Sequence, residues 1–203
     1  MPRLLLATNN RGKVTEYRAL LEDCGWEIVT PAEIGLALEV EESGADYVTN
    51  AKIKAQAFAQ ASGLLSLADD SGLEIDALGG RPGPLSARYA GDAADDEERV
   101  RKVLAEMKGI ERARRKARFR CVIALAEPSG KVHFAEGVAE GAIAEEPRGE
   151  RGFGYDPLFL LPEHGRTLAE LPLSEKNAVS HRGRAARKAC AILKAMLSEQ
   201  RRD

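Results

Sequence analysis

The chain has 203 residues, of which 44% are hydrophobic and 31% are charged, a composition that suits one compact core and argues against disorder. Its 30 basic and 32 acidic side chains give a formal net charge of -2, which provides no overall attraction to nucleic acid or to anionic membranes. We expect a single domain over residues 1–203 in the cytoplasm, because no apolar run approaches the roughly 20 residues of a membrane helix and the apolar start is too short for a signal peptide.

The first segments alternate between apolar and polar in the manner of an α/β fold. Residues 3–8 are predicted to form a short buried strand, residues 9–12 a polar turn, and residues 13–24 a helix with its apolar side chains on one face. A second strand is expected at residues 26–30. These segments predict a strand, loop and helix unit at the start of the sheet.

An acidic connection and a second helix come next. Residues 31–44 contain Glu41 and Glu42, and the run is too short to be an acidic tail. Residues 46–61 carry an apolar stripe at helical spacing, and Gly63 follows as the expected terminator. The pattern predicts an amphipathic helix packed on the sheet.

A buried strand is predicted at residues 64–68, and it ends at the carboxylates Asp69 and Asp70. We therefore expect the acidic pair to emerge at the carboxyl end of a strand, where ligands bind in α/β sheets. The glycines and prolines of residues 79–84 predict a turn-rich loop.

The second half of the chain is expected to contribute a helix, a hairpin and a final helix. Residues 95–107 look helical, and the strand-like runs 117–126 and 131–138 are separated by the turn residues 128–130. Residues 181–200 show an apolar face at helical spacing. Because a hairpin joins antiparallel strands, the predicted sheet is mixed.

The three cysteines, Cys24, Cys121 and Cys190, are far apart in the sequence and lack the close pairing of zinc sites and disulfide scaffolds. Each lies in an apolar periodic segment. We interpret them as thiols of the core.

The loop between the first strand and the first helix is a candidate phosphate site, because free backbone N–H groups and a positive helix end favour anions. Its spacing is not that of a Walker A loop. The competing interpretation is an ordinary turn in which asparagines cap the helix. The candidate residues are Thr8, Asn9, Asn10, Arg11, Gly12 and Lys13.

Asp69, Asp70 and Ser71 form a second candidate, with Glu41 and Glu42 as possible partners. Neighbouring residues of an extended segment point to opposite sides, so at most one carboxylate faces a given site and the other is structural. Magnesium takes carboxylate oxygens when it also binds substrate phosphates. The alternative is a polar turn without a ligand.

The segment 152–157 is a third candidate, because glycines on both sides of Phe153 let the backbone approach a flat ligand. Stacking of a base on an aromatic ring contributes roughly 1–3 kcal/mol. The alternative is that Phe153 and Tyr155 fill a core edge.

Charged residues before and at the start of the final helix form a fourth candidate. Ser180 is a plausible N-cap, and His181 and Arg182 then occupy the first turn, where cations are disfavoured by the helix dipole. Such a mismatch indicates a ligand, although a solvated charged turn around Lys176 is the competing interpretation. The basic run 112–120 is interpreted as a solvated loop rather than an RNA site, since Phe119 is its only aromatic residue.

In their order along the chain, these motifs resemble those of the inosine triphosphate pyrophosphatase family. The motifs are TNNRGK at 8–13, EESG at 41–44, ADDSG at 68–72, LGGRPGPLSARYAG at 78–91, GFGYDP at 152–157, EKN at 175–177 and SHRG at 180–183. Each string is weak alone, but the ordered combination is specific. The resemblance implies an elongated mixed β-sheet with flanking helices, two lobes around a central nucleotide-binding cleft, a homodimer, and Mg²⁺ as cofactor.

The resemblance also implies roles for individual residues. The loop 8–13 would hold the triphosphate, Glu41 and Asp70 would bind Mg²⁺, and Asp70 would be the catalytic proton acceptor or would orient a metal-activated water. Lys54 and Ser71 would contact the substrate. The nucleotide pocket would consist of Phe153 against the base together with Gly154, Tyr155, Asp156, Lys176, His181 and Arg182.

The implied activity is Mg²⁺-dependent hydrolysis of inosine and xanthosine triphosphates and their deoxy forms to the monophosphate and diphosphate. We expect Arg182 to donate to the 6-oxo edge of the base, because arginine cannot accept from the amino group of adenine. Two alternatives are a pyrophosphatase that clears pyrimidine or modified nucleotides and a non-catalytic nucleotide or RNA-binding module. We expect neither nucleic acid nor membrane as a partner.

Overall fold

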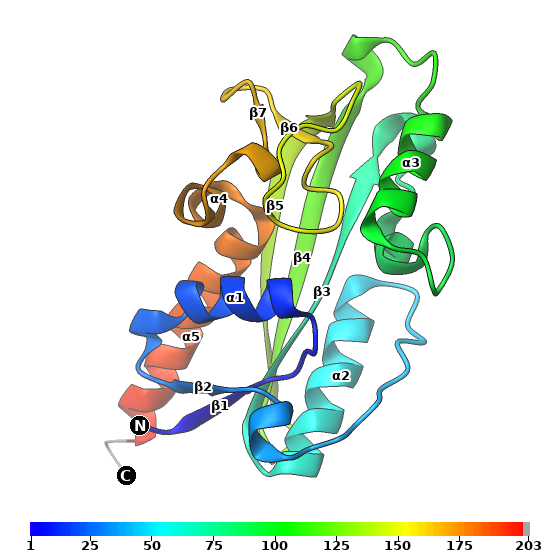
Figure 1. Ribbon diagram of the computed structural model, residues 1–203. Helices are drawn as coiled ribbons and strands as arrows, with labels where there is room; N and C mark the ends of the chain where they lie inside the picture. Colours follow the sequence, from blue (N-terminus) through cyan, green and yellow to red (C-terminus); the bar gives the residue numbers. More distant parts are fainter. Residues whose placement is uncertain (201–203) are drawn as a thin grey trace. The chain divides into compact units, whose positions relative to one another are not determined.

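The structure, a computed structural model, describes residues 1–200. The chain forms two compact units, which we call unit 1 and unit 2 (Figure 1). Unit 1 consists of Met1–Asp70, Cys121–Gly137 and the residues from Arg182 onward. Unit 2 consists of Ser71–Arg120 and Val138–His181.

The strands form a seven-stranded sheet in the order β2-β1-β3-β4-β5-β6-β7. Strand β1 pairs in parallel with β2 and β3, whereas β6 pairs antiparallel with β5 and β7. The sheet is therefore mixed, as predicted. The strands are β1 (Arg3–Leu6), β2 (Glu27–Val29), β3 (Leu65–Ile75), β4 (Lys116–Ala126), β5 (Val132–Ile143), β6 (Phe159–Leu161) and β7 (Arg166–Thr167).

The described residues form five α-helices and several short 3-10 turns. No helix among them combines the length and the hydropathy that crossing a bilayer requires. The helices are α1 (Arg11–Leu20), α2 (Tyr47–Ser62), α3 (Asp96–Glu106), α4 (Leu173–Val179) and α5 (His181–Gln200).

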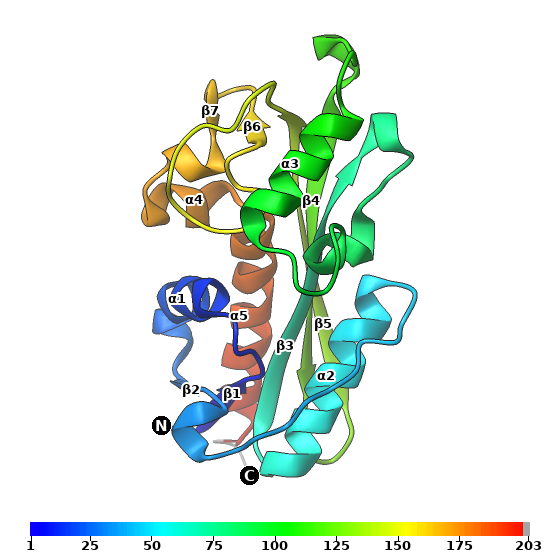
Figure 2. The same cartoon turned by 45° about the vertical axis from the view of Figure 1, so that its right-hand side comes forward.

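Within unit 1 the sheet has helices on both faces (Figures 1 and 2). Leu4 and Leu6 of β1 pack in the cluster that includes apolar residues of α1 and α5, whereas Leu5 packs in the cluster with α2. Because successive side chains of a strand point to opposite faces, burial on both faces explains the continuous apolar run of β1.

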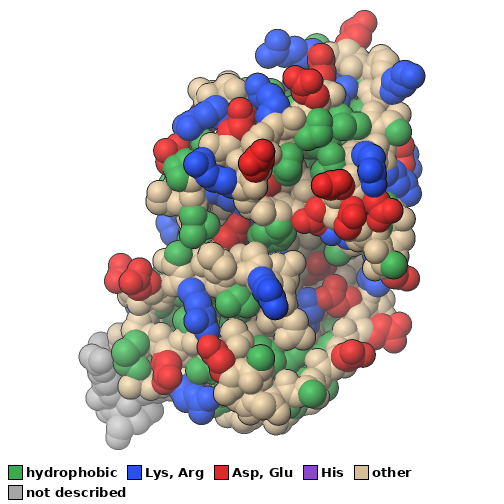
Figure 3. Space-filling view, viewed as in Figure 1, with side chains coloured by type: hydrophobic (Ala, Val, Ile, Leu, Met, Phe, Trp, Pro, Cys, Tyr) green, Lys and Arg blue, Asp and Glu red, His purple; other side chains and the backbone are tan. Residues whose placement is uncertain are grey.

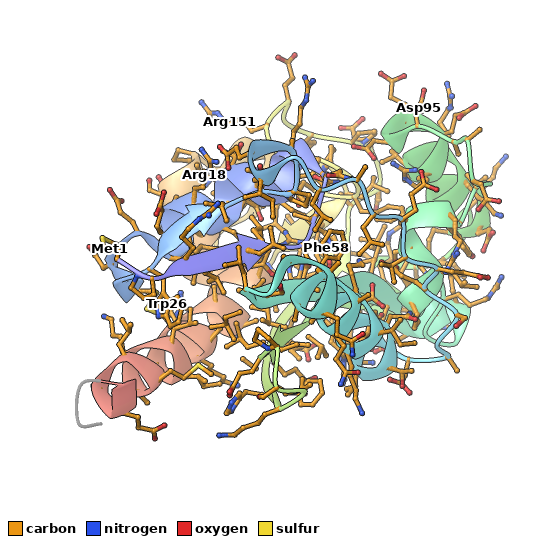
Figure 4. All side chains as sticks on the ribbon, turned by 90° about the horizontal axis from the view of Figure 1, so that it is seen from below. Met1, Arg18, Trp26, Phe58, Asp95 and Arg151 are labelled. Atoms are coloured by element: carbon orange, nitrogen blue, oxygen red, sulfur yellow. A yellow bond between two sulfur atoms is a disulfide. The ribbon has the colours of Figure 1, made fainter. Side chains whose placement is uncertain are left out.

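Unit 1 also contains a disulfide, which corrects the prediction that all three cysteines are thiols. Cys24 bonds Cys190 across a sequence separation of 166 residues, and only Cys121 is a free, buried thiol among the described residues. Cys190 lies on α5, and the indole of Trp26, which is labelled in Figure 4, donates to the carbonyl of Leu193 on the same helix at 3.1 Å. Packing of α5 thus brings together cysteines that the sequence separates.

Unit 2 has its own apolar cluster. Val100 and Val103 of α3, together with its C-cap Met107, pack with Leu73 of β3 and Phe119 of β4. Helix α3 is therefore fixed to the strands by one apolar face, and its other side carries charged residues.

Candidate functional site

The residues predicted to bind substrate or metal are divided between the two units, and each unit is described by itself. Unit 1 holds Thr8, Asn9, Asn10, Arg11, Gly12, Lys13, Glu41, Lys54, Asp70 and Arg182. Unit 2 holds Ser71, Phe153, Gly154, Tyr155, Asp156, Lys176 and His181.

The acidic pair lies inside β3, which runs from Leu65 to Ile75, and not at the end of a strand as predicted. Asp69 contacts Lys13, whereas Asp70 contacts Asn50 of α2. The two carboxylates therefore face opposite sides of the sheet, as their adjacency predicted. The strand can continue through both because each carboxylate has a partner.

Asp69 is buried in an ion network. Lys13 Nζ lies 2.9 Å from Oδ1 and a guanidinium nitrogen of Arg182 lies 3.6 Å from Oδ2. Burial alone would raise the pKa of Asp69, but the positive charges of Lys13 and Arg182 outweigh it and hold the pKa well below its usual range. Asp69 is therefore a permanent anion, which positions Lys13.

Asp70 has the opposite electrostatic surroundings. Burial raises its pKa to about 6; the hydrogen bond from Asn50 Nδ2 at 3.0 Å lowers it, while the charge of Glu42 raises it. The carboxylate is thus held in place, and the raised pKa means that burial favours its protonated form more than in free aspartate. Such a group suits contact with a cation or with a polarised water.

The candidate phosphate loop is the N-terminal end of α1. Asn10 is the N-cap, and its side chain accepts from the backbone N–H of Lys13 at 3.0 Å. Thr8 Oγ1 accepts from the N–H of Asn10 at 3.2 Å. The capping interpretation is confirmed, and it is compatible with an anion site because first-turn N–H groups of a helix lack partners within the helix.

The neighbouring loop supplies Glu42 to this region. Lys54 of α2 forms an ion pair with Glu42, and Lys54 Nζ lies 3.5 Å from the carbonyl oxygen of Asp69. Glu41, the predicted metal ligand, is exposed. The structure therefore shows that Glu42, and not Glu41, pairs with Lys54, a choice that the sequence left open.

The oxygen donors of Asp70 and Glu42 fit a hard divalent cation such as Mg²⁺, since the two carboxylates repel each other and a cation would relieve that repulsion. Within residues 1–200, no three His, Cys, Asp or Glu side chains are grouped so that they could hold a metal ion. A magnesium ion here would therefore depend on substrate phosphates and water for its remaining ligands.

In unit 2, residues 152–156 form a tight loop, which we call the aromatic loop. Asp156 accepts from the N–H of Phe153 at 2.9 Å and forms an ion pair with Lys176 of α4. A Cβ at Gly152 would collide with the carboxylate of Asp156, so this position requires glycine. The ammonium of Lys176 lies 5.0 Å from the ring centroid of Phe153, within reach of a cation–π interaction.

Lys176 is 3% exposed, which argues against the solvated turn considered for this segment. The ring of His181 stacks on Phe119 with centroids 4.5 Å apart, so Phe119 belongs to the interior of unit 2. Of the basic run around Phe119, Arg112 and Arg114 are exposed, as predicted for a solvated loop. Arg115 is instead buried and donates to the carbonyl of Ile143 at 2.8 Å, and Arg118 pairs with Glu74.

Arg182 is 2% exposed and lies in unit 1, where it pairs with Glu16 at 2.6 Å. Burial lowers the pKa of Arg182, but the charges of Asp69 and Glu16 more than compensate and raise it. The guanidinium is thus held by carboxylates of α1 and β3, partners that the sequence did not indicate. Glu16 could have been noticed because it lies one turn after Lys13 on the same helix.

Asn50 was also missed. It lies four residues before Lys54 on α2, so both project from one face of the helix toward β3. A polar pair at this spacing beside an otherwise apolar stripe is the signal that could have identified it.

Known proteins resemble this chain over nearly its whole length. The profile of the Ham1 family matches residues 4–192. A protein of Desulforamulus reducens named dITP/XTP pyrophosphatase is 52% identical over 198 residues, which is 98% of either chain. One with the same name from Bacillus subtilis is 50% identical over 96% of this chain and 98% of its own. The structure of a HAM1 protein from Coxiella burnetii superposes with a TM-score of 0.87 at 45% identity, covering 96% of this chain and 100% of the other.

Proposed function

The chain belongs to the Ham1 family, and from that membership we propose that it hydrolyses non-standard purine nucleoside triphosphates, such as dITP and XTP, to the monophosphate and pyrophosphate. The observation that carries the proposal is that adjacent residues of β3 have different partners: Asp69 binds Lys13 of α1, and Asp70 accepts from Asn50 of α2. Asp70, held by Asn50, can orient a water, and Lys13, fixed by Asp69, supplies the positive charge that phosphoanhydride hydrolysis needs.

In the proposed reaction, water attacks the α-phosphorus and the bond from that phosphorus to the bridging oxygen breaks, so that pyrophosphate leaves. The protein contributes positioning and neutralisation of charge, because the transferred group develops little covalent character with the enzyme. Lys13 and the first-turn amides of α1 attract the phosphate oxygens, and Asp69 fixes the ammonium of Lys13. Asp70 orients the attacking water or accepts its proton.

We propose Mg²⁺ as the cofactor, held by Asp70 and by Glu41 or Glu42 from the neighbouring loop. When bound, it supplies positive charge to the phosphates and polarises water. The remaining contacts of the triphosphate are assigned to the loop 8–13 and to Lys54.

Base recognition is assigned to residues of unit 2 and to Arg182. The ring of Phe153 offers a stacking surface, and Lys176 and Asp156 fix that surface by an ion pair and a hydrogen bond to the loop backbone. His181 and Arg182, the first residues of α5, supply donors suited to a 6-oxo purine. Adenine offers an amino group at the same position and would leave these donors without acceptors.

The test is pyrophosphate release from inosine, xanthosine and uridine triphosphates by the purified chain, with Mg²⁺ and with excess chelator. We expect release from the purine substrates, loss of release with chelator, and little activity on uridine triphosphate. Preference for uridine triphosphate would indicate a pyrimidine-clearing enzyme, and binding without turnover would indicate a binding module.

The cytoplasmic location and the homodimer are parts of the same proposal. Sedimentation equilibrium measures the oligomeric state directly, and a monomer at micromolar concentration would contradict the homodimer. Failure of a labelled RNA to bind at low salt would support the assignment of a small-molecule substrate, because non-specific nucleic-acid binding is strongest there.

A further inference from the structure

The first turn of α3 contacts the aromatic loop through a single carboxylate. Asp96 Oδ2 accepts from the backbone N–H of Gly154 at 2.7 Å. The other oxygen of Asp96 accepts from Arg99, one turn later on α3. The carboxylate is therefore held at both oxygens, and its orientation toward Gly154 is fixed by Arg99.

Arg99 is itself fixed by backbone groups of the preceding segment. It donates to the carbonyl of Ala87 at 3.0 Å and to that of Ala94 at 2.5 Å. Through Arg99, Asp96 is connected to the motif at residues 78–91, for which no role has been found so far. That motif is thus part of the support of Asp96.

The same motif contacts the aromatic loop a second time. The hydroxyl of Tyr155 donates to the carbonyl of Ser86 at 2.8 Å. Ser86 is buried, and its own hydroxyl donates to the carbonyl of Gly83 at 2.6 Å and accepts from the N–H of Leu73 at 2.9 Å. Consecutive residues of the aromatic loop are therefore held from outside, Gly154 by Asp96 and Tyr155 by Ser86.

We propose that Asp96 is a positioning residue for base recognition, acting through the backbone of Gly154 on the ring of Phe153. The inference rests on the proposed function and deepens it by assigning the purine selectivity of the aromatic loop to α3 and the 78–91 motif. The physical reason is that glycines on both sides of Phe153 leave the ring mobile unless the backbone is held. Holding it in advance removes an ordering cost from substrate binding.

The other acidic residues of this turn provide a matched control. Figure 3 shows acidic side chains gathered at the start of α3, where Asp96, Glu97 and Glu98 are the first-turn acids. Glu98 and the N-cap Asp95 form a capping box. Glu97 is exposed, so Glu97→Gln removes the same charge from the same turn at a position away from the aromatic loop.

The experiment compares Asp96→Ala, Asp96→Asn and Glu97→Gln with the parent chain. For Asp96→Ala we expect KM for inosine triphosphate to rise about 5- to 20-fold while kcat changes by less than about twofold, because the lost contact acts on binding of the base. The efficiency on uridine triphosphate should change by less than about twofold. Asp96→Asn keeps an acceptor oxygen and should recover part of the loss, and Glu97→Gln should behave as the parent.

Hydrogen exchange of the peptide that covers the aromatic loop gives a readout that needs no substrate. We expect faster exchange there in Asp96→Ala and unchanged exchange in the α3 peptide. Equal loss of efficiency on both substrates, or faster exchange throughout α3, would show a general structural role and overturn the proposal. Unchanged KM with unchanged exchange would also overturn it. A parent chain that releases no pyrophosphate contradicts the proposed function, while the exchange measurement still decides whether Asp96 holds the loop.

Discussion

Asp69 and Asp70 are adjacent in β3, yet cations hold the pKa of Asp69 low despite its burial, whereas burial raises the pKa of Asp70. Lys13 Nζ lies 2.9 Å from Asp69, whereas the neutral amide of Asn50 donates a hydrogen bond to Asp70 at 3.0 Å. A pleated strand separates the two environments by the thickness of one backbone. The sheet thereby gives one aspartate a structural charge and leaves the other available for chemistry.

Replacing the carboxylate of Asp70 is expected to stop turnover without unfolding the chain. Asp70→Asn keeps the volume and an oxygen that accepts from Asn50, but it removes the charge that binds a cation and receives a proton. We predict a fall in kcat of about 10²–10⁴-fold, with an unchanged circular dichroism spectrum. Near-parental turnover in the folded variant would remove Asp70 from the mechanism.

The position of bond cleavage follows from the proposed attack at the α-phosphorus. Hydrolysis in oxygen-18 water should place the label in the nucleoside monophosphate and leave pyrophosphate unlabelled. Mass spectrometry of the two products measures this directly. Orthophosphate together with a nucleoside diphosphate would indicate a different class of hydrolase.

The buried position of Arg182 predicts a large effect on stability. Arg182→Ala leaves Glu16 and Asp69 with less compensating charge in a buried environment. Removing one partner of a buried ion network typically costs about 3–5 kcal/mol, and urea unfolding should show a loss of this size. A loss of unfolding free energy below about 1 kcal/mol would mean that other cations compensate Glu16 and Asp69 in the variant.

Because that loss could hide any role in base recognition, Arg182→Lys is the better variant for specificity. It keeps the charge but removes the planar set of donors. We expect the ratio of kcat/KM for inosine to that for adenosine triphosphate to fall at least about tenfold, and the exposed Arg184→Lys serves as control. An unchanged ratio would leave Arg182 a purely structural role.

The exposed pair of Arg18 and Glu33 predicts a pH-dependent contribution to stability. Hydrogen bonds from Arg18 and from the backbone of Thr30 lower the pKa of Glu33 to about 2, below its unfolded value of 4.5. The contribution is therefore complete above pH 4.5 and is lost as the pH falls toward 2. The difference in urea midpoint between the parent and Glu33→Gln should shrink over that range, and a constant difference would contradict it.

The disulfide predicts a change in stability on reduction. In denaturant without reductant, one thiol should react with a thiol reagent, and all three should react after reduction. Because the bond closes a loop of 166 residues, chain-entropy arguments give a stabilisation of roughly 3–5 kcal/mol. Thermal melting with and without reductant, with Cys190→Ala as control, measures it. Three reactive thiols before reduction would mean that the bond does not form.

The periodic elements were predicted well because they depend on local patterns. Helix α5 runs over His181–Gln200 as expected, and α2 begins after the cap Asp46 and ends at Gly63, which has the left-handed conformation. The mixed sheet followed from the hairpin between β4 and β5. These signals are contained within a few residues of sequence.

The features that were missed depend on contacts between distant residues. We predicted that the strand ends before Asp69 and Asp70, because two adjacent carboxylates are unfavourable inside a sheet unless they have partners. Their partners, Lys13 and Asn50, are remote in sequence, and β3 continues through both residues. Helix α4 was not predicted, since its seven residues show only a charged turn, and the burial of Lys176 is explained by Asp156. The opposite orientation of the two aspartates was predicted because it needs only the geometry of a strand.

The bond between Cys24 and Cys190 also gives the chain a closed covalent topology. Within the ring lie all the candidate residues except those of the first loop and the start of α1, which belong to the N-terminal tail. A single protease cut anywhere in the ring would therefore produce two pieces that remain one molecule until the disulfide is reduced. New chain ends introduced at such a cut would leave Lys13 covalently joined to Asp69 and Asp70, either along the chain or through the disulfide.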